Sequence, residues 1–152
     1  MIQLQDEASV GGSLYGGYAA GTGAASGAQV TLQDKATVGG NLYGGYTAGA
    51  GAASGASSTG ASAVENAVVI RADVAGSVTG GAALHSASAN RVEITDAVIA
   101  GDVTGSSGAQ TDDNQILLFG ATVTGDVVAG TSAGSTGNTL AIYPGQSAIH
   151  DF

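Results

Sequence analysis

Few ionisable side chains in this sequence have the types and spacing that hydrolytic chemistry requires. Enzymes that cleave glycosidic bonds place two carboxylates across the bond, one of them acting as general acid, often with a basic partner nearby. The local acids that could form such a group are Glu93, Asp96, Asp112 and Asp113. The bases of the chain are Lys35, Arg71 and Arg91. Because these bases are scattered over separate segments, we predict that the chain has no catalytic residues and is not an enzyme.

Other site chemistries also find little support. His85 and His150 have no serine or acid at motif spacing. The segments GTGAASG and GAGAASG lack both the glycine spacing of a dinucleotide loop and the Gly-Lys-Ser/Thr of a phosphate loop. The chain has no cysteine, which excludes thiolate metal sites and disulfides. We therefore expect no cofactor and no bound metal.

The composition indicates an ordered acidic protein rather than a disordered or fibrous one. Of the 152 residues, 27 are glycine, one is proline, 43% are hydrophobic, and the formal net charge is -9. That hydrophobic content is high for a disordered chain, and glycine does not recur at every third position as in collagen. An acidic surface disfavours nucleic acid and anionic lipid. No stretch approaches the roughly 18 apolar residues of a membrane span, so we expect no direct membrane insertion of this segment.

A repeat explains most of the remaining sequence. The motif VGGSLYGGY at residues 10–18 returns as VGGNLYGGY at 38–46, and Asn66, Asn90, Asn114 and Asn138 follow one another at intervals of 24 residues. Four aliphatic positions recur in each unit, and we call them columns. The first column is Ile2, Val30, Val68, Val92, Ile116 and Leu140. The second is Leu4, Leu32, Ile70, Ile94, Leu118 and Ile142. The third is Val10, Val38, Val74, Ile99 and Val123, and the fourth is Leu14, Leu42, Val78, Val103 and Val127.

Alternation with period two within each unit is typical of strands that bury one face. Strands that recur once per unit stack in parallel, each rung about 4.8 Å above the last. The sequence thus predicts an all-β single domain over 1–152, a parallel β-helix of about six rungs with essentially no helix. At the corners, we expect Gly12, Gly40, Gly76, Gly101 and Gly125 to adopt positive φ. The asparagines are expected to tolerate the left-handed conformation and to hydrogen-bond along their own stack.

The spacing within the first column predicts three regions. It is 28 residues from Ile2 to Val30 (30−2), 38 from Val30 to Val68 (68−30), and 24 thereafter. Residues 1–66 therefore form longer rungs with loops rich in glycine, alanine and serine, 67–138 form regular rungs, and 139–152 form a terminal rung or partial cap. The excess residues, AAGTGAASGA and TAGAGAASGASSTGASA, either pack as a thin extra layer or are flexible.

Two sets of side chains on this framework are candidates for binding. Asp102 and Asp126 occupy equivalent positions about one rung apart, where a cation such as Ca²⁺ could relieve their repulsion, although we expect both to be solvated. Tyr15 is expected to lie over Tyr43, and Tyr18 over Tyr46. Stacked tyrosines stabilise neighbouring rungs by aromatic packing, and they also form strips that bind sugars or peptides. We favour packing and retain all four as candidate ligand-facing residues.

The pattern resembles the β-helical passenger regions of bacterial autotransporters, the type V secreted, adhesin-like surface proteins. The resemblance is carried by units such as NRVEITDAVIAGDVTG, by the Gly/Ala/Ser-rich tracts and by the closing NTLAIYPGQSAIHDF. It implies a segment exposed outside the cell, with the export signal absent from this sequence. It also implies adhesion, aggregation or display, with a host or bacterial surface glycan or protein as a partner. It supplies no binding residues.

Two functions follow as expectations. The first is a non-enzymatic stalk or self-associating scaffold. The second is a β-helix that binds or cleaves glycans through the tyrosines and nearby acids. Ile2 and Leu4 begin a full aliphatic rung immediately after Met1, and open strand edges invite pairing with another chain. We therefore expect end-to-end association through this rung, while Ile149 and Phe152 cover part of the opposite end.

Overall fold

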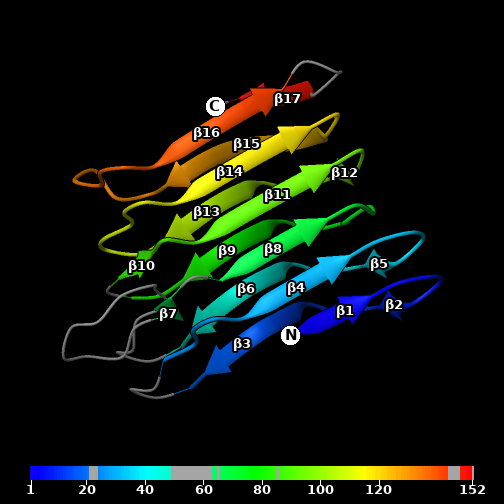
Figure 1. Ribbon diagram of the computed structural model, residues 1–152, viewed down its shortest axis with the longest axis horizontal. Helices are drawn as coiled ribbons and strands as arrows, with labels where there is room; N and C mark the ends of the chain where they lie inside the picture. The colour runs from blue at the N-terminus through cyan, green and yellow to red at the C-terminus, as the bar shows by residue number, and fades with distance from the viewer. Residues whose placement is uncertain (21–23, 49–62, 65, 85, 144–147, 152) are drawn as a thin grey trace.

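A computed structural model shows the chain as a β-solenoid of about five turns (Figure 1). It describes residues 1–20, 24–48, 63–64, 66–84, 86–143 and 148–151. These residues form strands, turns and bends, and none of them is in a helix. No helix long and apolar enough to cross a membrane is found among them.

One face of the solenoid is a six-stranded parallel sheet, and its register confirms the first two columns. Its strands, in spatial order, are β1 (Ile2–Leu4), β4 (Gln29–Leu32), β8 (Ala67–Ile70), β11 (Arg91–Thr95), β14 (Gln115–Phe119) and β16 (Thr139–Tyr143). Ile2 pairs with Val30 and Leu4 with Leu32, and the predicted alignment continues without a slip to Leu140 and Ile142. The alignment predicted across the unequal intervals of 28 and 38 residues is therefore confirmed.

The other faces carry the third and fourth columns. The long strands are β3 (Leu14–Ala19), β6 (Leu42–Thr47), β9 (Val78–Ala82), β13 (Val103–Ser107) and β15 (Thr122–Gly130). The short strands of these faces are β2 (Ser9–Val10), β5 (Thr37–Val38), β12 (Val98–Ile99) and β17 (Ala148–Asp151). Two further short strands, β7 (Ala63–Val64) and β10 (Ala87–Ser88), pair with each other in a separate sheet. The pairings Leu14–Leu42 and Val10–Val38 begin the two columns, and every later member aligns as predicted.

The columns form the core. In the interior rungs their side chains are 0–2% exposed, as for Leu32, Val78 and Val123. In the first rung the same columns are only partly buried, because no rung lies beneath them within the described structure. Each interior rung is thus covered on both sides by its neighbours, as expected when repeats contact only adjacent repeats.

The corner glycines serve a different purpose from the predicted one. Positive φ occurs at Gly27, Gly120 and Gly137 among the described glycines, and not at the predicted corner position. A Cβ built on Gly40 would instead lie 2.8 Å from the carbonyl carbon of Gly12, and one on Gly76 would lie 2.5 Å from the carbonyl oxygen of Gly40. The prediction of positive φ was therefore wrong, because close approach of the preceding rung, rather than a left-handed backbone, requires glycine here.

Two glycines at equivalent corner positions can test whether close approach of the preceding rung is the reason for glycine. Changing Gly40 to alanine should destabilise the domain by about 1–3 kcal/mol, the usual cost of forcing extra atoms into a packed site. Changing Gly12 to alanine should have an effect within about 0.5 kcal/mol, because a Cβ there meets nothing within 4 Å. Urea denaturation monitored by circular dichroism measures the free energy of unfolding of both variants. Equal losses for the two variants would contradict the close-approach explanation.

The asparagines form a buried hydrogen-bonded ladder, as predicted. Asn66 Nδ2 donates to Asn90 Oδ1 at 2.8 Å, Asn90 Nδ2 donates to Asn114 Oδ1 at 3.3 Å, and Asn114 Nδ2 donates to Asn138 Oδ1 at 2.8 Å. Their own backbone is not left-handed. Positive φ belongs instead to the residue before Asn90, Asn114 and Asn138, namely Ala89 (φ 52), Asp113 (φ 55) and Gly137 (φ 70). The conformational half of the prediction is therefore corrected, while the stacking half is confirmed.

The first glycine-rich insertion packs in part as an extra layer. Ala25 is 4% exposed and forms a small apolar cluster with Ala87 and Ala83, and its carbonyl oxygen accepts a hydrogen bond from Asn66 Nδ2 at 3.4 Å. Small side chains thus allow the insertion to lie close against the solenoid. The second insertion falls mostly on residues 49–62, outside the described residues.

Candidate functional site

The four tyrosines form one cluster on neighbouring strands β3 and β6. Tyr15 stacks on Tyr43 with ring centroids 5.0 Å apart and planes 4° apart, and Tyr18 stacks on Tyr46 at 5.6 Å and 10°. Within each rung the two rings meet edge to face, at 5.5 Å for Tyr15–Tyr18 and 5.2 Å for Tyr43–Tyr46. Both arrangements are favourable for aromatic pairs, so the cluster stabilises the first two rungs. The predicted stacking is confirmed.

The cluster is also accessible from solvent. Tyr15 is 38% exposed and Tyr18 is 57% exposed, whereas Tyr43 and Tyr46 are half-buried. A pair of glycines separates the tyrosines of each strand and lets both rings of a rung face outward; Gly44 and Gly45 on β6 are buried, and Gly16 and Gly17 on β3 are partly buried. The cluster therefore offers an apolar surface with phenolic hydroxyls, of a kind that can stack against a sugar ring.

The candidate acids named in the sequence analysis are held by different partners. Glu93 lies on β11 and pairs with Arg91, whose Nη2 lies 2.6 Å from Glu93 Oε2. Asp112 Oδ1 accepts a hydrogen bond from the backbone N–H of Thr136 at 2.8 Å. Thr136 lies 24 residues later, in the next rung. No group of three or more histidine, cysteine or carboxylate side chains that could hold a metal is found among the described residues. His85 is outside those residues, and for His150 only the backbone, on β17, is described.

A recess at one corner does gather bases and acids, which sequence reasoning missed. Between the second and third columns the chain has six steps from Leu32 to Val38 (38−32) but only four from Ile70 to Val74 (74−70). The short corner leaves a shallow recess between longer neighbours. We call it the corner recess, and its charged lining is Asp34, Lys35, Arg71, Asp73 and Asp96. The uneven corner length, visible in the sequence, was the signal that could have revealed it.

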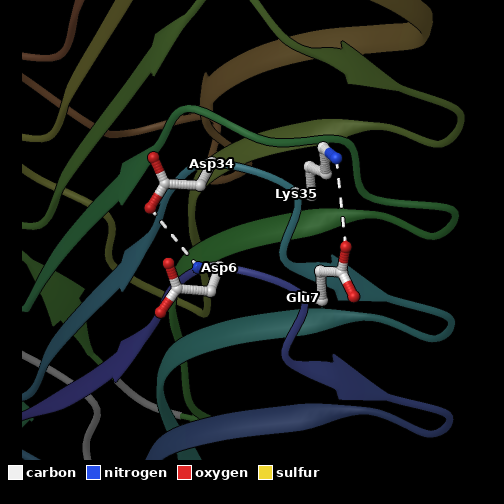
Figure 2. A network of polar contacts seen from close by, with 4 residues as sticks. All are labelled: Asp6, Glu7, Asp34 and Lys35. Carbon is white, nitrogen blue, oxygen red and sulfur yellow. Dashed lines mark hydrogen bonds and ion pairs between the residues drawn. The ribbon is translucent and has the colours of Figure 1, made fainter.

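The charged residues that line the corner recess are all exposed to solvent, and Asp73 Oδ1 also accepts a hydrogen bond from the Val98 backbone at 2.8 Å. Figure 2 shows the neighbouring residues of two rungs, with Asp6 near Asp34 and Glu7 near Lys35. The Asp6 backbone donates to Asp34 Oδ2 at 3.4 Å, and Lys35 Nζ lies 3.9 Å from Glu7 Oε1 with both side chains more than four-fifths exposed. Such an exposed ion pair contributes little. Asp6 and Asp34 have positive φ, which aspartate tolerates, so these acids also have a structural role in the turn.

Asp102 and Asp126 belong to a polar ladder that runs along a second corner. Asp102 Oδ1 accepts a hydrogen bond from the Asp126 backbone at 3.0 Å, and Ser77 Oγ accepts one from the Asp102 backbone at 3.0 Å. Both aspartates are exposed. The carboxylate of Asp102 therefore has a donor in the protein and access to water.

From this geometry we predict that stability does not depend on calcium. A chelator should leave the melting temperature unchanged, because the exposed carboxylate of Asp102 already has a hydrogen bond from a backbone N–H and contact with water. A ligand that binds only the folded state must stabilise it. A rise of several degrees on adding millimolar calcium would therefore contradict the prediction, and loss of that rise in Asp126→Asn would locate the site.

The residues predicted for end-to-end contact lie at an open strand edge. Within the described structure β1 pairs only with β4, so Ile2 and Leu4 are covered on one side. Val10 and Leu14 of the same rung are also only partly buried, although they pack against the core. Ile149 lies on β17, paired with Val123 through the backbone, while Phe152 is outside the described residues.

Comparisons of the chain with protein families, with curated proteins and with solved structures find no significant match in any of the three.

Proposed function

We propose that this chain is a non-enzymatic structural segment of a secreted or cell-surface bacterial protein, a β-solenoid stalk or self-associating scaffold of the autotransporter passenger type. The observation that supports it best is the uniformity of the rungs. The same four columns continue in register along the solenoid, and interior members are 0–2% exposed. The sequence of each rung is thus used to continue the same core along a rod.

The distribution of charged groups agrees with a scaffold. The candidate acids lie on different segments, with Glu93 on β11, Asp96 in the turn that follows it, and the adjacent Asp112 and Asp113 before β14, and the corner recess is lined by groups that are exposed to solvent. Cleavage of a glycosidic bond by carboxylates needs two of them placed across one bond. No contact among the residues described supports such a pair, so we assign the chain no catalytic residues.

Display on a cell surface tests the proposal. The chain would be placed after a signal peptide and an epitope tag and before an outer-membrane translocator, in a Gram-negative host. We expect intact cells to bind an antibody against the tag, and external protease to release a folded β-fragment. Thr104→Asp, a change on the outer face of β13, serves as a control that should be displayed equally well. Retention of the wild-type chain inside cells that display an unrelated passenger would contradict the proposal.

Glycan binding through the tyrosine cluster is the second candidate, and the exposure of Tyr15 and Tyr18 favours it. A glycan array compares wild type with Tyr18→Ala and with Tyr143→Ala, which removes a tyrosine that is 44% exposed on the other sheet. A scaffold gives no specific binding. Binding that Tyr18→Ala loses and Tyr143→Ala keeps would establish the second candidate instead.

A further inference from the structure

The six-stranded sheet has two open edges that match each other. Among the described residues β1 pairs only with β4, and β16 pairs only with β14. Both edges carry the first and second columns, as Ile2 and Leu4 on β1 and as Leu140 and Ile142 on β16. Leu140 is partly buried and Ile142 is 44% exposed, in columns whose interior members are almost fully buried.

From this match we infer that self-association is head to tail, with β1 of a second copy of the chain added to β16 of the first. The inference rests on the self-association in the proposed function and specifies its contact. The register follows that of every rung below, with Leu140 beside Ile2 of the second copy and Ile142 beside Leu4. Each joint then adds a parallel strand pair and covers aliphatic side chains that are partly exposed at both ends.

The shape of a rung favours this polarity over a symmetric pairing of two β1 edges. The three faces of a rung have strands of different length, for example Gln29–Leu32, Thr37–Val38 and Leu42–Thr47. Translation along the axis places β1 of one copy over β16 of the next and β2 over β17, so that two of the three faces align together. A two-fold rotation reverses the chain direction, so that only one face can be aligned while the others are displaced.

The tyrosine cluster is outside this contact. β17 pairs with β15 only at residues 122–126, and no described strand covers residues 127–130, the part of β15 that continues the sheet of β3 and β6. A joint made through β16 therefore leaves the tyrosine face of the second copy without a strand directly beneath it. Removing a tyrosine ring should leave association unchanged.

Head-to-tail contact is heterologous, so each copy keeps one free edge and assembly continues into filaments instead of closing as a dimer.

The two edges can be blocked separately. Ile2→Lys places a charge on the β1 edge, and Ile142→Lys places one on the β16 edge. Both changes are at end rungs, where the lysine stem can cover apolar surface while the ammonium group reaches water, so folding should persist. Circular dichroism checks this, and Leu4→Lys replaces Ile2→Lys if the latter does not fold.

Sedimentation velocity over a concentration series distinguishes the outcomes. Wild type and Tyr18→Ala should form species of increasing size, and each blocked variant alone should remain at 14.4 kDa. An equal mixture of the two blocked variants should form a species of twice that mass and no larger, because each partner supplies the edge that the other lacks. Dimers of Ile142→Lys alone would overturn the head-to-tail polarity while leaving self-association intact. A wild type that stays monomeric would overturn self-association itself, and the display experiment would still test the scaffold.

Discussion

Replacing Val103 with aspartate is expected to unfold the domain or to lower its free energy of unfolding by about 4 kcal/mol or more. Val103 is fully buried in the fourth column, paired with Val78 on β9 and Val127 on β15. A carboxylate there would have no partner and no water, and burial of an unpaired charge is among the most unfavourable substitutions. Urea denaturation monitored by circular dichroism measures the loss.

The neighbouring residue provides the matched control. Thr104 follows Val103 on β13 and is half-buried, so its side chain faces outward. Thr104→Asp introduces the same charge into the same strand and should change stability by less than about 1 kcal/mol. If Val103→Asp retains the stability of wild type, the assignment of the inward face is wrong for this strand, since a shift of one residue exchanges the two faces.

Replacing Asn90 with alanine is expected to lower the free energy of unfolding by about 3 kcal/mol, because removing one partner leaves buried donors unpaired. Asn90 Oδ1 accepts hydrogen bonds from both the side chain of Asn66 at 2.8 Å and its backbone N–H at 3.3 Å. Asn90 Nδ2 donates to Ser106 Oγ at 2.8 Å. All three residues are completely buried, so water cannot replace the lost amide.

Asn138 is the control for this ladder. It is the last asparagine and is only partly buried, and its Oδ1 accepts from the backbone and side chain of Asn114 at 3.0 Å and 2.8 Å. Asn138→Ala removes an equivalent pair of bonds where water can take the place of the amide, so the loss should be clearly smaller. Thermal melts of both variants test the difference. Equal losses would show that the buried environment adds nothing to the bonds of Asn90.

The sequence by itself determined the stacking of the rungs. Aliphatic residues with period two, repeated at intervals of 28, 38 and 24 residues, have only one alignment that keeps all four columns inside. The register from Ile2 to Leu140 and the stacking of Tyr15 on Tyr43 follow from that alignment, since residues at equivalent places in parallel rungs lie one above another. For this part of the fold, knowledge of one rung is sufficient to place the next.

Only the tertiary structure decided what depends on the path between the columns. The recess that brings Lys35 and Arg71 together arises because one corner is shorter than its neighbours, and its effect on the surface depends on how far each turn projects. Gly40 is glycine because the backbone of Gly12 passes beneath it, 28 residues earlier in the chain (40−12). A residue pattern records which side chains avoid water. It does not record the distance between two backbones, and that distance sets the shape of the surface and the space available at each corner.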